Sequence, residues 1–445
     1  MIELAPLLAR VPKHESFWPW EVIRERVHRL CADYPGLARC ETVGESVEGR
    51  PIELLAVGHG RRHVLLVGVP HPNEPVGTLT IDFLAQLLCE DEALRTTLDC
   101  TLWIVPVADP DGLVLNAGWL GETFSPLRYA LEFYRPPHCE QVEWSFPVEY
   151  RTLRFARPTP ETAAVMRVME RVRPQLFYSL HNAGFCGVYF YVSALLPGLA
   201  PAFQQLVAEQ GLALHRGEPE VPYLRELAPA IFALFGIDET YEYLARTLDV
   251  DPAPLIESGT SADDWLKMLC PEAFSLVCEV PYYTSPLLAD LSPAGESRRA
   301  ALLAGIARSR ELHAATARHY AELAPRLPDH RLTRSVRDYV EKTPRRLAAD
   351  ERQAADPAYE REATRAEQVD ARVCGLLHHA CYRGELRRLA VLAGDRARAA
   401  RIEQELLALV TEIERESRLC VLPLRPLVAT QAGAGLLAMA ATAPA

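Results

Sequence analysis

Residues 63–74 have the sequence HVLLVGVPHPNE, and this stretch decides the fold. Its first part is an almost continuous apolar run, which is typical of a strand buried on both faces of a sheet. The run ends in a turn that contains His71 and Glu74. Open α/β sheets build their sites just past the carboxyl ends of their strands. The stretch therefore predicts a central strand and a site at its end.

Strands and helices alternate along the chain on both sides of this run. We expect further strands at residues 38–43, 52–57, 101–107, 175–180, 188–192 and 274–280. We expect helices at residues 20–34, 75–88, 161–172 and 295–323. The DPDG sequence at residues 109–112 is typical of a turn that closes a strand. This succession indicates an α/β fold with a mixed, largely parallel sheet covered by helices.

The composition changes near residue 325, where Ala, Arg and Glu with helical periodicity replace the strand pattern. We therefore expect an α/β domain over residues 1–325 and a mainly helical C-terminal extension over residues 326–445. The extension is expected to cover the active-site face or to join copies in a homo-oligomer. Its last part contains QAGAGLLAMA at residues 431–440, in which small residues outnumber Leu and Ile. This composition predicts a docked helix rather than a membrane anchor.

Charge and cysteine content exclude several classes of protein. Lys and Arg number 47 against 59 Asp and Glu, so the formal net charge is -12. An acidic chain is a poor general binder of nucleic acid, because phosphate recognition needs a basic surface. The 11 cysteines form no C-x-x-C pair, and the first twenty residues lack an export signal. We therefore expect a cytoplasmic protein without a disulfide framework and without a membrane partner.

Two more candidate site residues follow predicted strands. His181 ends one strand within SLHN, and Glu279 ends another within FSLVCE. Two histidines and one glutamate, with one position left for water, are a standard ligand set for catalytic Zn²⁺. A carboxylate at the end of an apolar strand is costly to bury unless a partner such as a metal-bound water is present. Taken singly, each residue could also be an ordinary polar side chain at the end of a strand, exposed to solvent or hydrogen-bonded to its neighbours.

Seven fragments in one order strengthen the catalytic interpretation. They are residues 32–58 and the motifs HPNE (71–74), DPDG (109–112), PTPET (158–162), SLHN (179–182), GTSADDW (259–265) and FSLVCE (274–279). Together they resemble the M14 family of zinc carboxypeptidases over about residues 15–323. The resemblance implies an α/β/α sandwich around a mixed eight-stranded sheet. It also implies amide hydrolysis with one Zn²⁺ held by His71, Glu74 and His181, and with Glu279 as the general base.

The family also uses an arginine after the DPDG turn to stabilise the oxyanion. Arg128 and Arg135 are the candidates, and the spacing to the next motif favours Arg128 as the catalytic residue. The other arginine, Arg135, is then expected to contact substrate.

The chain departs from the family where a carboxypeptidase binds the terminal carboxylate of its substrate. Glu143 and Trp144 occupy the positions of the family's Asn-Arg pair, so the bidentate arginine clamp is absent. An acidic and an aromatic side chain favour an amine, an amide or a flat group over a free carboxylate. We therefore expect Glu143 and Trp144 to bind substrate.

The sequence thus predicts a zinc-dependent hydrolase of a small peptide or amide that is not a standard free peptide C-terminus. An ordinary metallocarboxypeptidase is the alternative if another arginine, such as Arg151 or Arg154, binds the carboxylate. A third interpretation is an M14-like binding module without catalytic activity.

Overall fold

A computed structural model describes residues 3–217, 219–248 and 250–443 of the chain. Its main sheet has ten strands among the described residues, in the order β1-β2-β4-β3-β7-β11-β8-β10-β9, with β14 paired to β11. Their bounds are β1 Ala38–Glu45, β2 Pro51–Val57, β3 Arg62–Val67, β4 Cys100–Val105, β7 Leu176–Phe185, β8 Tyr189–Val192, β9 Glu226–Ala228, β10 Ile231–Ala233, β11 Phe274–Thr284 and β14 Cys420–Val421. Two small two-stranded sheets pair β5 Val148–Tyr150 with β6 Leu153–Phe155 and β12 Pro293–Ser297 with β13 Glu362–Thr364.

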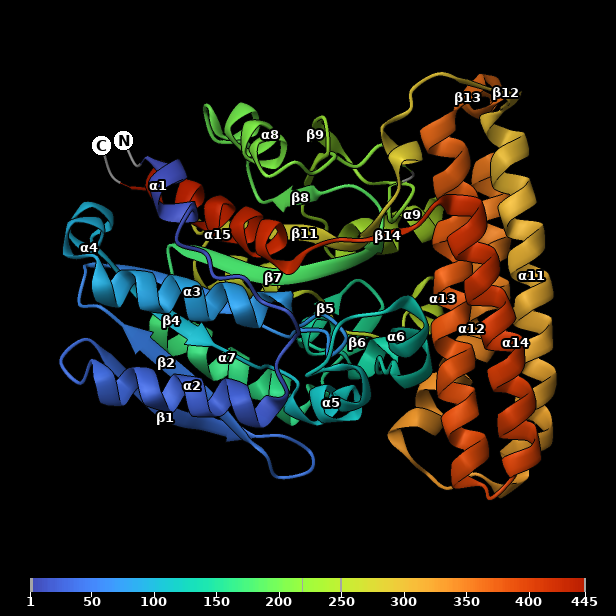
Figure 1. The fold of residues 1–445 in the computed structure, drawn as a ribbon, viewed down its shortest axis with the longest axis horizontal. Helices are drawn as coiled ribbons and strands as arrows, with labels where there is room; N and C mark the ends of the chain where they lie inside the picture. The colour runs from blue at the N-terminus through green and yellow to red at the C-terminus, as the bar shows by residue number, and fades with distance from the viewer. Residues whose placement is uncertain (1–2, 218, 249, 444–445) are drawn as a thin grey trace.

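The helices form two groups, which lie side by side in Figure 1. Those of the α/β part are α1 Leu4–Leu8, α2 Trp20–Asp33, α3 Val76–Glu90, α4 Glu92–Leu98, α5 Pro110–Leu115, α6 Pro126–Glu132, α7 Pro160–Val172, α8 Leu199–Glu209, α9 Ile237–Leu248, α10 Ala262–Leu269 and α15 Leu424–Ala441. The others stand upright beside the sheet and are α11 Arg298–Leu323, α12 Arg331–Ala354, α13 Arg365–Leu392 and α14 Arg396–Ser417.

Helices cover both faces of the sheet because its central strands are apolar on both faces. In β3, Leu66 packs into a core shared with α2, α3, α8 and α15, whereas Leu65 packs into a core shared with α7 and α10. Both leucines are fully buried. The α/β sandwich with a mixed sheet predicted from the sequence is therefore confirmed.

The expected number of eight strands is wrong, because the described residues form ten in the main sheet. The additional strands are short: β9 and β10 have three residues each and β14 has two. Segments this short carry no readable alternation of apolar and polar residues. The DPDG segment also differs from a simple turn, because Asp109 caps α5 by accepting a hydrogen bond from the Gly112 amide at 2.8 Å.

The predicted boundary near residue 325 stays a prediction, and packing crosses it in both directions. Helix α11, which precedes the boundary, packs against α12 and α13. Helix α15, which follows it, packs against α3 and α8. The docked helix predicted for residues 431–440 is thus confirmed. Among the described residues, no helix has the length and apolar character needed to span a bilayer.

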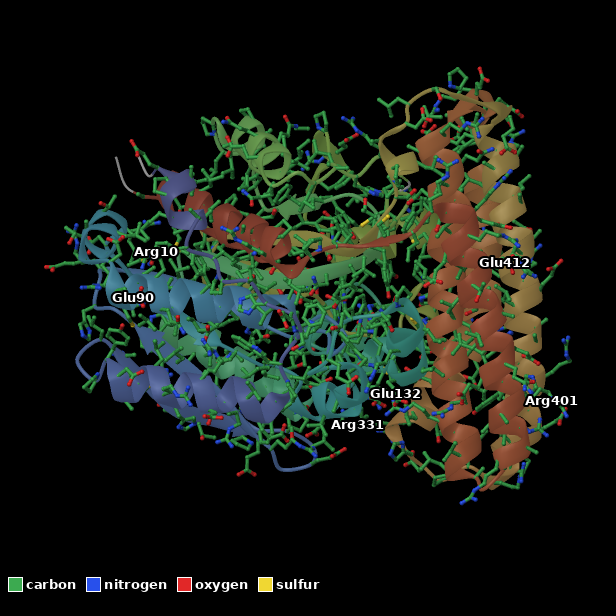
Figure 2. All side chains as sticks on the ribbon, in the orientation of Figure 1. Arg10, Glu90, Glu132, Arg331, Arg401 and Glu412 are labelled. Atoms are coloured by element: carbon green, nitrogen blue, oxygen red, sulfur yellow. The ribbon has the colours of Figure 1, made fainter. Side chains whose placement is uncertain are left out.

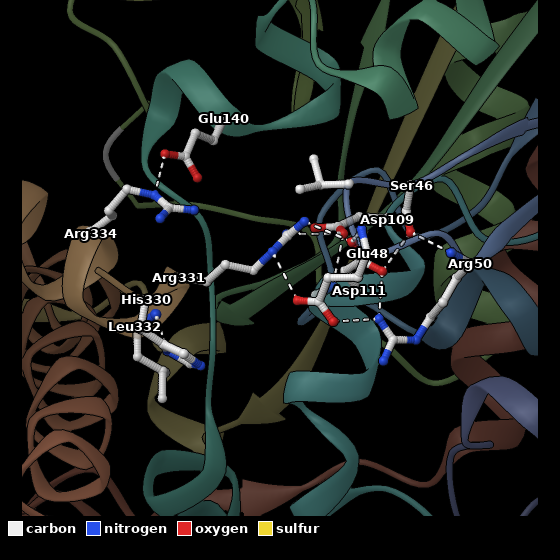
Figure 3. Close-up of polar contacts among 12 residues, drawn as sticks. Ser46, Glu48, Arg50, Asp109, Asp111, Glu140, His330, Arg331, Leu332 and Arg334 are labelled. Carbon is white, nitrogen blue, oxygen red and sulfur yellow. Dashed lines mark hydrogen bonds and ion pairs between the residues drawn. The ribbon is translucent and has the colours of Figure 1, made fainter. Parts of the chain in front are cut away.

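One partly buried arginine joins the upright helices to the α/β part (Figures 2 and 3). Arg331, the first residue of α12, places Nη2 2.8 Å from Asp111 Oδ2 and 3.6 Å from Glu161 Oε1. Its Nη1 lies 3.9 Å from Asp109 Oδ1. The three carboxylates come from the DPDG and PTPET motifs. Arg50 of the α/β part also pairs with Asp111, at 2.6 Å, so Arg331 and Arg50 together compensate this cluster of buried carboxylates.

Candidate metal centre

The loop between β3 and α3 carries His71 and Glu74. Val69 lies at the start of this loop with φ 53°, a left-handed conformation that costs a β-branched residue free energy. At the end of the loop, Asn182 Oδ1 accepts the Val76 amide hydrogen bond at 3.0 Å and so fixes the first turn of α3. Both His71 and Glu74 are 4% exposed.

His181 and Glu279 reach the same edge of the sheet from parallel strands. They are paired positions in the register of β7 and β11. Strand β3 is parallel to β7, with Val67 paired to Ser179, so the loop after β3 opens at this edge as well. Strand order and direction therefore bring together residues that are more than 200 positions apart in the sequence.

Glu74 is the most heavily bonded carboxylate of this edge. Its Oε1 accepts a hydrogen bond from Arg135 Nη1 at 2.6 Å. Its Oε2 lies 3.0 Å from His181 Nδ1 and accepts the Asn182 amide hydrogen bond at 3.2 Å. Burial alone would raise the pKa of Glu74, but Arg135 and His181 outweigh burial and lower it. Glu74 is therefore held as a carboxylate.

A second carboxylate, that of Glu143, approaches the other nitrogen of the same imidazole. Glu143 Oε2 lies 3.0 Å from His181 Nε2 and accepts a hydrogen bond from Ser179 Oγ at 2.9 Å. Burial works against a charged His181, but Glu143 and Glu74 raise its pKa well above the usual value. An imidazole between two carboxylates lies in a strongly negative field, which attracts a cation.

The residues present fit a zinc ion. One donor atom each from His71, His181 and Glu143 lies within 4.8 Å of the other two. The predicted ligand Glu74 is not in this group, but its Oε2 lies 3.0 Å from His181 Nδ1. The rings of His71 and His181 have their centroids 4.9 Å apart. Bond lengths near 2 Å place zinc ligands roughly 3–4 Å from each other, so small side-chain rotations close such a cluster.

Two buried atoms of the site have no hydrogen-bond partner among the described residues. They are His71 Nδ1 and Glu279 Oε2. Unpaired buried polar atoms are costly, and a metal ion with a bound water would satisfy both. Burial raises the pKa of Glu279 well above its usual value, and the Oε1 of this residue lies 3.8 Å from His181 Nδ1. The site thus offers nitrogen and oxygen ligands and a carboxylate facing them.

The two candidate arginines differ in position. Arg128 donates to the Gly118 carbonyl at 2.8 Å and pairs with Glu122, and its side chain is 42% exposed. Arg135 instead pairs with Glu74. The structure therefore brings Arg135 into the site and does not bring Arg128, although sequence spacing favoured Arg128. The spacing between sequence motifs does not reveal this difference, because helix α6 begins at Pro126 and turns Arg128 toward residues 118–122.

The remaining predicted substrate residue, Trp144, follows Glu143 in the chain and packs against two other rings. Its ring contacts those of His138 and Phe235, with centroids 5.2 and 5.7 Å away. The alternative arginines do not reach the centre, since Arg151 pairs with Glu242 at 2.7 Å and Arg154 binds carbonyls of its own hairpin.

Gln431 of α15 is a supporting residue that no sequence motif indicated. Its Nε2 donates to the carbonyl oxygen of His181 at 2.7 Å, and its Oε1 accepts from Thr80 Oγ1 at 2.9 Å. Gln431 is fully buried. The available signal was a single amide side chain in an otherwise small and apolar tail.

A second group of possible metal ligands lies away from this edge. His28, Cys40 and Glu53 also have donor atoms within 4.8 Å of one another. However, Arg24 already donates to Glu53 Oε1 at 2.8 Å, as His28 does at the same distance if its Nε2 is protonated. The Glu53 oxygen is thus already paired, and the His28 side chain is 56% exposed, unlike the buried histidines at the sheet edge, so we assign no metal to this group.

Comparisons with known proteins agree with the motifs. Residues 23–216 match the sequence profile of the zinc carboxypeptidase (Peptidase_M14) family. Carboxypeptidase B of Astacus astacus is 28% identical over 102 residues, which cover 22% of this chain and 34% of that protein. The inactive metallocarboxypeptidase ECM14 of Ajellomyces capsulatus (strain H143) is 30% identical over 112 residues, which cover 22% of this chain and 19% of that protein. The chain thus spans about a third or less of the length of these curated relatives.

The crystal structure of carboxypeptidase A from Helicoverpa armigera aligns with a TM-score of 0.40 and 15% identity, over 63% of this chain and 69% of that one. The matched residues include the HPNE and SLHN motifs, which carry His71, Glu74 and His181. Over residues 23–216 the chain is thus similar to the M14 zinc carboxypeptidases.

Proposed function

We propose that the chain is a zinc-dependent hydrolase of an amide or peptide bond, with His71, Glu74 and His181 as the metal ligands. The arrangement around His181 carries this proposal. Its Nδ1 lies next to Glu74 and its Nε2 next to Glu143. A metal-bound histidine usually gives its second nitrogen to a carboxylate, which fixes its tautomer. We therefore infer that Glu143 orients His181 in addition to facing substrate.

When bound, Zn²⁺ would polarise the scissile carbonyl and lower the pKa of a coordinated water toward about 7. Glu279 takes the proton of the attacking water and passes it to the leaving amine. Its burial, which raises its pKa, suits this role because a general base works best when its pKa is near the working pH. Arg135 supplies the positive charge that stabilises the developing oxyanion, in place of Arg128. The contact of Arg135 with Glu74 supports this reassignment.

The substrate is a small peptide or amide without a free carboxylate beside the scissile bond. The absence of the Asn-Arg clamp at Glu143 and Trp144 supports this specificity. So do the local contacts of Arg151 and Arg154, which occupy both guanidinium groups away from the centre.

Metal analysis and a matched pair of substrates test the proposal. The purified chain is expected to bind one equivalent of zinc and to cleave an amidated hippuryl dipeptide faster than the same dipeptide with a free carboxylate. The reverse order would support an ordinary metallocarboxypeptidase. Failure to retain stoichiometric zinc would support a binding module instead.

A further inference from the structure

Arg135 reaches Glu74 from a segment that has no regular structure of its own. Residues 133–137 connect the seven-residue helix α6 to a 3₁₀ turn at residues 138–140. A short helix and an irregular segment do not fix an arginine side chain by themselves. Asn116 bonds both backbone groups of Tyr134, at 2.9 and 3.0 Å. Further contacts to this segment come from α13, some 250 residues later in the sequence.

Glu385 of α13 makes the contact nearest to the site. Its Oε1 accepts the hydrogen bond of the Arg135 backbone amide at 3.1 Å. Glu385 is fully buried, so this hydrogen bond is shielded from water. Its position fixes the backbone from which the Arg135 guanidinium extends 2.6 Å from Glu74 Oε1.

Arg388, one turn later on α13, holds the preceding residues. Its Nη1 donates to the carbonyl oxygens of Glu132 at 2.9 Å and Phe133 at 3.1 Å, and its Nη2 donates to that of Leu115 at 2.9 Å. These bonds satisfy carbonyls at the end of α6, which have no partner within the helix. A guanidinium is suited to this role because its donors form a rigid fork.

Helices α13 and α6 pack closely against each other at Gly384. A Cβ atom on Gly384 would lie 1.7 Å from the carbonyl oxygen of Ala130, so only glycine fits. Glu385 is the next residue along α13. The close approach therefore places Glu385 and Arg388 within reach of the Arg135 segment.

We propose that Glu385 is a positioning residue of the metal centre, which acts with Arg388 to hold Arg135 against Glu74. The inference rests on the proposed function, because it gives the helical extension a part in building the zinc site. It goes beyond a covering role for these helices. The carboxyl of Glu385 is needed as an acceptor and not as a charge, since burial raises its pKa to about 8.

Zinc affinity, measured by competition with a chelator, tests this inference in the full chain. Glu385→Ala is expected to weaken zinc binding about tenfold, the lower end of the effect of removing an outer-shell partner. Glu385→Gln keeps an acceptor oxygen and is expected to restore the affinity to within about twofold of the wild type. Arg372→Ala is the matched control, because Arg372 lies on α13 and pairs at the surface with Glu296.

A double-mutant cycle separates positioning from general stability. If Glu385 acts through Arg135, Glu385→Ala has no further effect on zinc affinity in an Arg135→Ala background. An equal loss in both backgrounds would overturn the inference, as would unchanged affinity in the folded single variant. If Glu385→Ala does not fold, Arg388→Lys keeps the charge but loses the fork and is expected to weaken zinc binding in the same direction. Absence of zinc from the wild type would instead refute the proposed function, and this inference with it.

Discussion

His181 and Glu279 are paired residues on the parallel strands β7 and β11, and their Nδ1 and Oε1 atoms lie 3.8 Å apart. The pairing places a candidate metal ligand and a candidate base at the same edge of the sheet. A shift of one residue in this register would turn one of the two side chains to the opposite face. The chemistry proposed for the site thus depends on strand register as much as on residue identity.

Replacement of the base separates catalysis from metal binding. Glu279→Gln is expected to lower kcat by roughly a hundredfold to ten-thousandfold, because general acid–base catalysis contributes on that scale. Zinc content should stay at one equivalent, since Glu279 is not among the proposed ligands. Steady-state kinetics and metal analysis of the same preparation check both statements. Turnover at the wild-type rate would remove Glu279 from the mechanism.

Zinc binding is expected to stabilise the fold. A ligand present at a hundred times its Kd adds about 2.7 kcal/mol to the free energy of unfolding, provided that it binds only the folded state. Chelator-treated protein should therefore unfold at a lower temperature than zinc-loaded protein in calorimetry. The same comparison with His71→Ala should show little difference, and an undiminished zinc effect in that variant would exclude His71 as a ligand.

Asp109 predicts a specific pH dependence of stability. Burial raises its pKa from 3.8 to about 7, although Arg331 acts in the opposite direction. The pKa of Asp109 is higher in the folded state than in the unfolded state. The free energy of unfolding that Asp109 contributes is therefore fully present below about pH 4 and is lost as the pH rises through 7. The Asp109→Asn variant should lack this loss while keeping an acceptor for the Gly112 amide. Denaturant unfolding at intervals from pH 4 to 8 measures the difference between the two proteins.

The Asp109 prediction has a direct control in Arg331. Replacing Arg331 by Gln removes the cation that lowers the pKa of Asp109. The pH range over which the protein loses stability should therefore extend to higher pH. If the free energies of unfolding of the wild type and of Asp109→Asn changed with pH in parallel, the loss of stability could not be assigned to Asp109.

Gln431 is expected to stabilise the end of β7. In Gln431→Ala the carbonyl oxygen of His181 loses a buried hydrogen bond, which costs about 1–3 kcal/mol. Gln205→Ala is a suitable control, because Gln205 is exposed and bonds only Glu209 in the next turn. The control should change stability by less than about 0.5 kcal/mol. Equal effects of the two substitutions on the urea midpoint would show that Gln431 has no special role.

The sequence was most informative where structure is local. The apolar run before His71 predicted a central strand, and β3 spans Arg62–Val67. Strand ends predicted the edge at which His71, His181 and Glu279 gather. These features follow from the periodicity of apolar residues and from turn-forming residues within short segments.

The sequence was least informative where side chains reach across the fold. Spacing favoured Arg128, but the direction of α6 turns it toward Gly118 and leaves Arg135 beside Glu74. Glu143 was expected to face substrate, and the structure adds its contact with His181.

By itself the sequence determined the longer strands and helices and the edge that carries the candidate ligands, because each depends on local patterns of apolar and turn-forming residues. Only the tertiary structure decided which arginine faces the site. It alone also linked Glu385 to Arg135 and Gln431 to His181 across about 250 residues. Such contacts depend on how helices pack against the folded sheet, and a local sequence pattern does not predict that packing.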